Sequence, residues 1–389
     1  MKRKHIFYTS YYGDLGGGEL QMLDHLQHTR LPRDKITAVL FRDGEFGKVL
    51  RKMNIHVEVI EWSLSRRTRL KDVPAFLKII ILMLGKGAGL VICNTYGDLL
   101  MAGPAALFLG VPLIWRSHAD VFPYLHLKTM MRKKVLLWFL KHKVGRILST
   151  TNYDRDLIVE SGVPSEKVCT VYNGIDPNQY FQAKSYRGTI RKEFNISDQT
   201  TLVGFIARMV PQKGHGKFFE ALSEVTKKVP NVKALIVGDT TLNYDEPEYK
   251  DVLRRQVEEL GLEEKICFTG FREDIPAIMN AIDIFVSASS KEPFGRTTVE
   301  AMISGKPVVA TRTAGSLEIV LDGVTGILVP IDDTRAMATA IISLVENPEK
   351  ASNMGRYGQK RAKELYNLSE IVPNMDHHCM ELYGPGGFR

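Results

Sequence analysis

Short apolar segments typical of buried β-strands alternate with helical stretches along the whole 389-residue chain. Parallel strands need a crossover connection, usually a helix, whereas antiparallel strands can be joined by a tight turn. A regular alternation of strand and helix therefore favours parallel sheets covered by helices. We predict strands at residues 4–9, 35–41, 56–60, 90–94, 112–116 and 145–149, and again at 201–206, 233–237, 266–269, 282–287, 307–311 and 326–329.

The alternation relaxes once, in a polar stretch from Ile175 to Asp198, and then resumes. With 44% hydrophobic and 25% charged residues, the chain is long enough to bury two cores. We therefore expect an α/β protein with one domain at residues 1–172 and a second at 173–370. A last helix and a tail follow at 371–389.

Composition and charge narrow the classes of partner. The net charge of +8 favours anionic partners such as nucleotide diphosphates or lipid headgroups. Nucleic acid is not expected, because neither zinc-finger spacing nor an RNA-binding sheet motif is present. Four cysteines without paired spacing favour a reducing compartment. The amino terminus has the pattern of a first strand rather than a signal peptide. We expect a cytoplasmic protein.

A basic and aromatic segment at residues 127–143 allows two interpretations that are compatible with each other. It can be a domain helix whose apolar face packs on the sheet while its lysines are solvated. It can also lie on an anionic membrane surface, as amphipathic basic helices do. The second interpretation predicts a protein that is peripheral on the cytoplasmic face of a membrane.

The segment from Asp283 to Pro307 carries the strongest indication of function. An apolar run at 281–288 predicts a buried strand, and residues 297–304 have helical spacing. The loop between them then lies at the carboxyl end of a strand, where open α/β sheets bind ligands. Gly295 allows the backbone to approach a ligand closely, and the amides of residues 296–298 are placed to hold a phosphate.

Two carboxylates, Glu292 and Glu300, flank this predicted phosphate site. Carboxylates repel phosphate, so their natural partners are neutral hydroxyl groups on either side of a diphosphate, such as those of a sugar and of a ribose. This arrangement predicts a nucleotide-sugar as the ligand. The alternative is structural, because Thr297 followed by Glu300 also fits a helix capping box.

With Pro293-Phe294-Gly295 and Gly305-Lys306-Pro307, the segment resembles the signature of retaining GT-B glycosyltransferases of family 4. Other family motifs recur in order at residues 173–176, 204–208 with 213–214, 268–271, 314–318 and 323–326, and more weakly at 16–19 and 117–120. The resemblance implies a GT-B fold, in which two Rossmann-like parallel-sheet domains face a central cleft. It also implies that the last helix returns to the first domain.

The resemblance assigns roles to individual residues. Arg208 and Lys213 would hold the diphosphate, Glu292 would position the donor sugar, Glu300 would anchor the ribose, and His118 would contact the donor sugar. Without the resemblance, the two cations fit an ordinary basic loop, and the histidine fits a structural hydrogen-bonding role. The further donor-binding candidates are Gly17, Gly18, Phe271, Arg272, Phe294, Gly295, Arg296 and Thr297, and the acceptor candidates are Asp14 and Asp120.

The predicted activity is that of a retaining hexosyltransferase. It would move a hexose or N-acetylhexosamine from a UDP- or GDP-sugar to a glycan, lipid-linked or small-molecule acceptor, as in polysaccharide biosynthesis. We expect no cofactor beyond the donor substrate and no metal. Two other interpretations stay open, namely a GT-B sugar-nucleotide epimerase or phosphorylase, and a non-catalytic subunit that binds a nucleotide-sugar.

Overall fold

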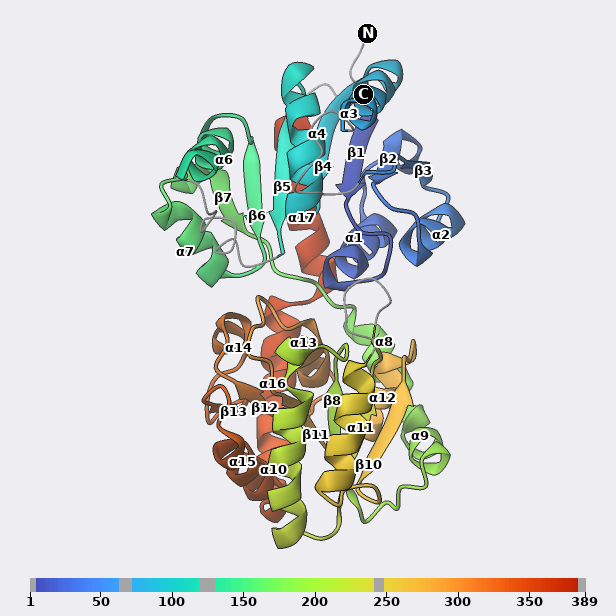
Figure 1. Ribbon diagram of the computed structural model, residues 1–389, viewed down its shortest axis with the longest axis vertical. Helices are drawn as coiled ribbons and strands as arrows, with labels where there is room; N and C mark the ends of the chain where they lie inside the picture. The colour runs from blue at the N-terminus through green and yellow to red at the C-terminus, as the bar shows by residue number, and fades with distance from the viewer. Residues whose placement is uncertain (1–4, 63–71, 119–129, 241–247, 384–389) are drawn as a thin grey trace. The chain divides into compact units, whose positions relative to one another are not determined.

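The computed structural model describes residues 5–62, 72–118, 130–240 and 248–383, without the side chains of 130–132. The chain divides into two compact units. The first comprises Met1–Gly174 together with Leu368–Arg389, and the second comprises Ile175–Asn367. Each unit is built around its own parallel sheet (Figure 1).

The described residues of the first unit form a seven-stranded sheet with the order β3-β2-β1-β4-β5-β6-β7. Its strands are β1 (His5–Ser10), β2 (Ile36–Leu40), β3 (His56–Val59), β4 (Ala88–Cys93), β5 (Leu113–Ser117), β6 (Arg146–Ser149) and β7 (Val168–Thr170). Its helices are α1 (Gly17–His28), α2 (Glu45–Lys52), α3 (Val73–Lys86), α4 (Tyr96–Phe108), α6 (Met130–His142), α7 (Asn152–Glu160) and α17 (Leu368–Tyr383).

This first sheet is buried on both faces. Because successive side chains of a strand point to opposite sides, each strand contributes to two cores. Phe7 of β1 packs into one core with Ile79 of α3 and Leu99 of α4. The neighbouring Tyr8 packs into the other core, with Met22 of α1 and Met375 of α17. Figure 1 shows the two layers, with α4 in front of the strands and α17 behind them.

The described residues of the second unit form a six-stranded sheet with the order β10-β9-β8-β11-β12-β13. Its strands are β8 (Thr201–Ile206), β9 (Val232–Val237), β10 (Ile266–Gly270), β11 (Ile284–Ser287), β12 (Val308–Thr311) and β13 (Gly326–Val329). Its helices are α8 (Pro177–Gln182), α9 (Arg187–Glu193), α10 (His215–Lys228), α11 (Tyr249–Glu259), α12 (Ile275–Ala281), α13 (Arg296–Ile303), α14 (Ala314–Ile319), α15 (Thr334–Glu346) and α16 (Pro348–Leu365).

The strand order reverses once in each sheet, and this reversal determines where a ligand can bind. In the second unit the chain leaves β8 towards β9 and β10, and later returns to place β11 on the other side of β8. In the first unit β1 and β4 are neighbours in the same way. Loops diverge at such a switch point, which opens a crevice at the carboxyl ends of the strands.

The predicted α/β architecture is confirmed, with strand ends shifted by one or two residues. The predicted strand 4–9 is found at His5–Ser10, and the predicted strand 282–287 is found at Ile284–Ser287. Among the described helices, none combines the length and the apolar composition that crossing a bilayer requires.

Candidate functional site

Lys213 and Glu292 meet at the switch point of the second unit. Lys213 ends a short 3-10 turn that follows β8, and Glu292 lies in the loop between β11 and α13. The Lys213 Nζ atom donates a hydrogen bond to Glu292 Oε2 over 2.5 Å, and both side chains are largely shielded from solvent. The structure therefore brings together two residues that the sequence analysis assigned to one site.

Close backbone contacts hold the loops that carry this pair. Gly214 has a φ of +74°, and a Cβ atom at this position would lie 2.1 Å from the carbonyl oxygen of Ala288. The amide of Ser290 donates to the carbonyl of Gln212 over 2.9 Å. The amide of Gly315 donates to the carbonyl of Glu292, also over 2.9 Å, which ties the loop before α14 to the same site.

The helix α13 begins at this edge of the sheet. Its N-cap is Gly295, which has a left-handed φ of +102° that favours glycine. The amino terminus of this helix lies next to the loop that carries Glu292, and helix amino termini favour anions. Of the three amides predicted to hold a phosphate, that of Thr298 donates to the carbonyl of Gly295 over 3.0 Å. Arg208 follows two residues after β8 at the same edge, and its side chain is exposed.

The capping-box interpretation of Thr297 and Glu300 is wrong. Because the helix begins directly after Gly295, Thr297 is already its second residue and does not act as the N-cap. Glu300 is buried and accepts a hydrogen bond from Arg296 Nε over 2.9 Å, one turn earlier on the same helix. Arg296 and Glu300 were both predicted to bind the donor, and in the structure their side chains hydrogen-bond to each other.

The three remaining donor-binding candidates of this unit have different environments. The ring of Phe294 is buried and packs edge-to-face on Tyr366 with 5.7 Å between centroids, so its side chain belongs to the interior of the unit. Phe271 is exposed at the end of β10, the edge strand. The guanidinium of Arg272 is held by Asp274 and Glu193, and hydrogen bonds to these carboxylates raise its pKa.

His215 is a residue of this site that the sequence analysis missed. It begins α10, is fully buried, and its ring centroid lies 4.6 Å from that of Phe205. Burial, together with the nearby charge of Lys213, lowers the pKa of His215 to about 4. The neutral ring, which lies two residues after Lys213 in the chain, packs on Phe205 of β8. Its position beside Lys213-Gly214 in the sequence was the available signal.

In the first unit, Gly18 lies against His118 and Asn94. Gly17 and Gly18 are the first two residues of α1, and a Cβ atom on Gly18 would lie 3.4 Å from His118 Cδ2 and 3.5 Å from Asn94 Nδ2. His118 Nε2 is 3.0 Å from Asn94 Oδ1. Burial, and secondarily the positive charge of Arg116, lowers the pKa of His118 well below its ordinary value.

Asn94 was not among the predicted site residues, although it ends a predicted strand. Asn94 Nδ2 and His118 Nδ1 are buried and have no hydrogen-bond partner among the described residues. The Asn94 backbone is fixed, because its amide donates to Asp98 Oδ2 over 2.7 Å. Burial raises the pKa of Asp98 to about 7. One free donor and one free acceptor beside a glycine are complementary to a hydroxyl group.

Of the two acceptor candidates, one lies within the described residues. Asp14 is half-buried in the loop after β1, and Asp120 lies outside the described residues, as do residues 127–129 of the basic segment. Within the described ranges, no group of three or more His, Cys, Asp or Glu side chains is arranged to hold a metal ion. Metal independence stays a prediction.

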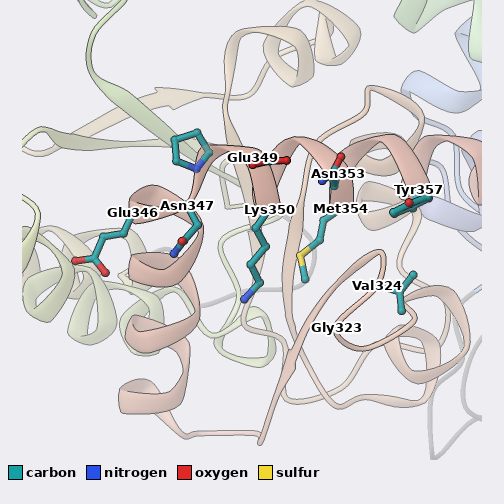
Figure 2. Close-up of a pocket in the computed structure, with 10 residues that line it drawn as sticks. Gly323, Val324, Glu346, Asn347, Glu349, Lys350, Asn353, Met354 and Tyr357 are labelled. Atoms are coloured by element: carbon teal, nitrogen blue, oxygen red, sulfur yellow. The ribbon is translucent and has the colours of Figure 1, made fainter.

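A surface cavity of about 700 Å³ lies at the opposite edge of the second sheet (Figure 2). Residues from the end of α15 and the start of α16 line it, together with Gly323 and Val324. These two residues precede β13, so the cavity is at the amino ends of the strands. It contains none of the residues predicted from the sequence.

Two sequence families match the two halves of the chain. The profile of Glycosyltransferase Family 4 matches residues 16–179, and the profile of Glycosyl transferases group 1 matches residues 187–361. These ranges fall in the first and the second unit, respectively, apart from residues 175–179. Both candidate regions, around His118 and around Glu292, lie inside a matched range.

Several characterised proteins resemble the chain. Mannosylfructose-phosphate synthase of Agrobacterium fabrum is 26% identical over 59% of this chain and 51% of its own length. N-acetyl-alpha-D-glucosaminyl L-malate synthase of Bacillus anthracis is 29% identical over 54% of this chain and 52% of its own. The chain thus spans about half the length of these first curated relatives.

Solved structures match over nearly the whole chain. Anabaena HepE, in complex with UDP-glucose, has a TM-score of 0.85 and 28% identity over 97% of this chain and 99% of its own. A glycosyltransferase from Rickettsia africae has a TM-score of 0.83 and 18% identity over 98% of this chain and 100% of its own, which supports the fold alone. The GT-B fold predicted from the sequence is confirmed.

Proposed function

Because this chain belongs to glycosyltransferase family 4 and has the GT-B fold, we propose that it transfers a sugar from a nucleotide-diphosphate donor with retention of configuration. The observation that carries the proposal is the Lys213–Glu292 pair at the switch point between β8 and β11. It places a cation and a carboxylate beside the amino terminus of α13, where a diphosphate and a sugar hydroxyl can each find a partner.

The two cations would act on the leaving group. Breaking the bond from sugar to phosphate develops negative charge on the departing diphosphate, and fixed cations stabilise that charge. Lys213 has three N–H donors and uses one on Glu292, so it can keep this carboxylate while it binds a phosphate oxygen. Arg208, exposed at the same edge, would be the second cation.

Glu292 would hold hydroxyl groups of the donor sugar. Its side chain is oriented by Lys213, and its backbone is held by the amide of Gly315. Glu300 would reach the ribose only if it shares its carboxylate between Arg296 and that hydroxyl, because Arg296 already occupies one of its oxygens. Burial lowers the pKa of His118, and as a neutral ring it would contact a hydroxyl group of the donor sugar, the role that the family resemblance implies.

We propose a UDP-hexose as the first donor to test. Anabaena HepE, which is similar over nearly the full chain, was solved with UDP-glucose and with UDP and glucose. GDP-sugars are the second class, since one relative in Mycolicibacterium smegmatis, 30% identical over 54% of this chain and 55% of its own length, is a GDP-mannose-dependent mannosyltransferase. The proposed acceptor is a glycan or a lipid-linked sugar, and the reaction is proposed to need no metal.

Release of the nucleotide tests this function. Purified protein is incubated with UDP-sugars or GDP-sugars, with and without an acceptor panel, and free nucleotide diphosphate is measured. The expected result is release that depends on acceptor, persists in EDTA, and gives a product whose anomeric proton keeps the donor configuration by NMR. Release of an isomerised nucleotide-sugar would indicate an epimerase, dependence on inorganic phosphate would indicate a phosphorylase, and donor binding without turnover would indicate a non-catalytic subunit.

Substitution of the central pair should abolish turnover while the fold survives. We expect Lys213→Ala and Glu292→Ala to lower kcat at least about 100-fold, because each removes a group that stabilises developing charge or orients the sugar. The matched control is Lys217→Ala, which breaks an exposed ion pair with Glu220 on the neighbouring helix α10. Near wild-type activity in either central variant, with the control unchanged, would contradict the assigned roles.

We also propose that the protein works as a peripheral protein at the cytoplasmic face of a membrane. The basic segment 127–143 is one contact for the lipid. In the described part of this segment, α6 exposes Val135 and Trp138, and the Nζ atom of Lys143 lies 5.4 Å from the centroid of the Trp138 ring. The proposed lipid contact also involves residues outside this segment.

A further inference from the structure

Three neighbouring helices, α3, α4 and α6, lie on one face of the first sheet. The buried sides of all three contribute to the same core. Helix α3 packs along α4, and Gly103 of α4 packs so closely on α6 that an added Cβ atom would lie 2.9 Å from Phe139 Cζ. The outward sides of the three helices therefore form one continuous surface of the first unit.

The outward side of α3 is apolar, although a surface helix normally keeps this side polar. Ala75, Ile79 and Met83 point into the core, as expected for a helix on a sheet. Yet the opposite side carries Leu77, Ile81 and Leu84, spaced at i, i+4 and i+7, and Ile81 is 67% exposed. A helix that is apolar all round is normally buried on all sides, so its outer stripe needs a partner.

The stripe continues across the other two helices. On α4 the exposed apolar residues Leu100, Pro104 and Leu107 recur with the same spacing, and the adjacent Phe108 is the most exposed at 74%. On α6 the exposed apolar residues, among the side chains that the structure describes, are Val135 and Trp138. Exposed apolar patches of this extent mark sites of interaction with proteins or membranes.

The charge of this surface is of one sign. The described sequences of α3, α4 and α6 contain one acidic residue, Asp98, and it is fully buried. The exposed charged side chains include Lys78 of α3 and Lys134 of α6. Helix α7 packs on the same core but carries the exposed Asp156 and Glu160, so the single sign of charge belongs to the surface of α3, α4 and α6. The helices on the other face of the sheet also carry acidic side chains, among them Asp24 of α1, Glu45 of α2 and Glu381 of α17.

We propose that the face formed by α3, α4 and α6 docks on an anionic lipid bilayer. The apolar stripe would enter the interface, while the lysines would contact acidic headgroups. A second copy of the chain fits this face less well, because a two-fold contact packs the same patch of both copies together and would gather the lysines of both in one interface. This inference rests on the proposed peripheral location and extends the lipid contact from α6 to α3 and α4.

Vesicle sedimentation tests the proposal with the full-length protein. The wild type should pellet with vesicles that contain phosphatidylglycerol and stay in solution with pure phosphatidylcholine, and high salt should weaken the binding. The variant Leu77→Gln, Ile81→Gln, Leu84→Gln keeps the charge and should bind at least tenfold more weakly. Brominated lipids should also quench the fluorescence of Trp138, which is exposed, whereas Trp115 is buried.

The matched control replaces three apolar residues of similar exposure in the second unit, Val252, Val324 and Tyr357, by Gln. It should bind vesicles like the wild type. The proposal is overturned if the α3 variant also binds like the wild type, or if the wild type does not bind anionic vesicles. It is equally overturned if light scattering shows a dimer that only the α3 variant dissociates. If the wild type binds anionic vesicles and the α3 variant binds equally well, the proposed peripheral location stands and only the α3 face is overturned. None of these readouts depends on sugar transfer.

Discussion

At the scale of single residues, the pair of Asn94 and His118 makes the most specific prediction. The His118 ring is neutral because burial and Arg116 lower its pKa, so the group is active above that pKa and loses its free acceptor as pH falls through it. Asn94→Asp would place a carboxylate 3 Å from the ring and raise the pKa. We expect the acid limb of kcat/KM to move upward by about one pH unit.

The control for this substitution is Asn152→Asp, which adds the same charge to the first unit. Asn152 hydrogen-bonds Tyr172 and Thr170, so its replacement leaves the ring of His118 untouched. Its pH profile should match that of the wild type. If Asn94→Asp lowers kcat/KM equally at every pH, Asn94 serves the fold and does not position His118.

At the scale of elements, the sheets could be predicted from the sequence and the start of α13 could not. A parallel strand buried on both faces is a continuous apolar run, which is visible without any partner, as at β4 (Ala88–Cys93). The start of α13 depends on the left-handed conformation of Gly295, which the chain adopts in its folded context. Thr297 looked like a cap because sequence spacing alone carries no φ angle.

The site residues also divide into those that could be predicted from the sequence and those that could not. The sequence placed Lys213 and Glu292 at one sheet edge because the carboxyl ends of parallel strands collect there. It gave no role to Asn94 or His215, because their environments are made by residues distant in the chain. The side-chain amide of Asn94 lies beside Gly18 and His118 only in the folded unit. His215 is shielded from water by Phe205 and the rest of the core.

The loop between β8 and α10 is held to its neighbour by a glycine, and this contact can be tested. Gly214→Ala would place a Cβ atom 2.1 Å from the carbonyl oxygen of Ala288 and strain a φ of +74°. We expect a destabilisation of about 3 kcal/mol, together with loss of activity, because the loop carrying Lys213 must move away from Glu292. Thermal melting and donor turnover measure the two effects.

Gly261→Ala is the matched control for this loop. Gly261 also has a positive φ, +62°, but no heavy atom lies within 4 Å of an added Cβ. It should lose only the cost of the left-handed conformation, about 1 kcal/mol, and should keep full activity. Equal destabilisation by the two variants would mean that the contact with Ala288 is readily relieved.

At the scale of the whole molecule, the first unit is closed by a helix from the far end of the chain. The chain leaves this unit at Gly174 and returns at Leu368, so α17 joins residues more than 300 positions away. Met375 and Cys379 of α17 enter the core, and Asp376 lies beside α1. The unit can therefore complete its core only after the second unit has been synthesised.

A buried relay fastens this helix, and breaking it should destabilise the first unit. Tyr8 donates to His25 Nδ1 over 2.9 Å, His25 Nε2 donates to Asp376 Oδ1 over 2.8 Å, and the amide of Arg30 donates to Asp376 Oδ2 over 2.9 Å. These bonds lower the pKa of Asp376 against the effect of its burial. Asp376→Ala would leave the buried donors of His25 and Arg30 without an acceptor, and at about 1–3 kcal/mol for each stranded donor we expect a loss of about 3–5 kcal/mol.

The control for the relay lies on the same helix. Glu381 pairs with Arg146 over 2.8 Å, but its side chain is 42% exposed, so Glu381→Ala should cost less than about 1 kcal/mol. Melting curves and limited proteolysis of residues 368–383 would measure both variants. Because an aspartate with a lowered pKa contributes its stability above its ordinary value, the difference between wild type and Asp376→Ala should shrink as pH falls below about 4. A constant difference down to lower pH would show that Asp376 acts by packing instead of by its charge.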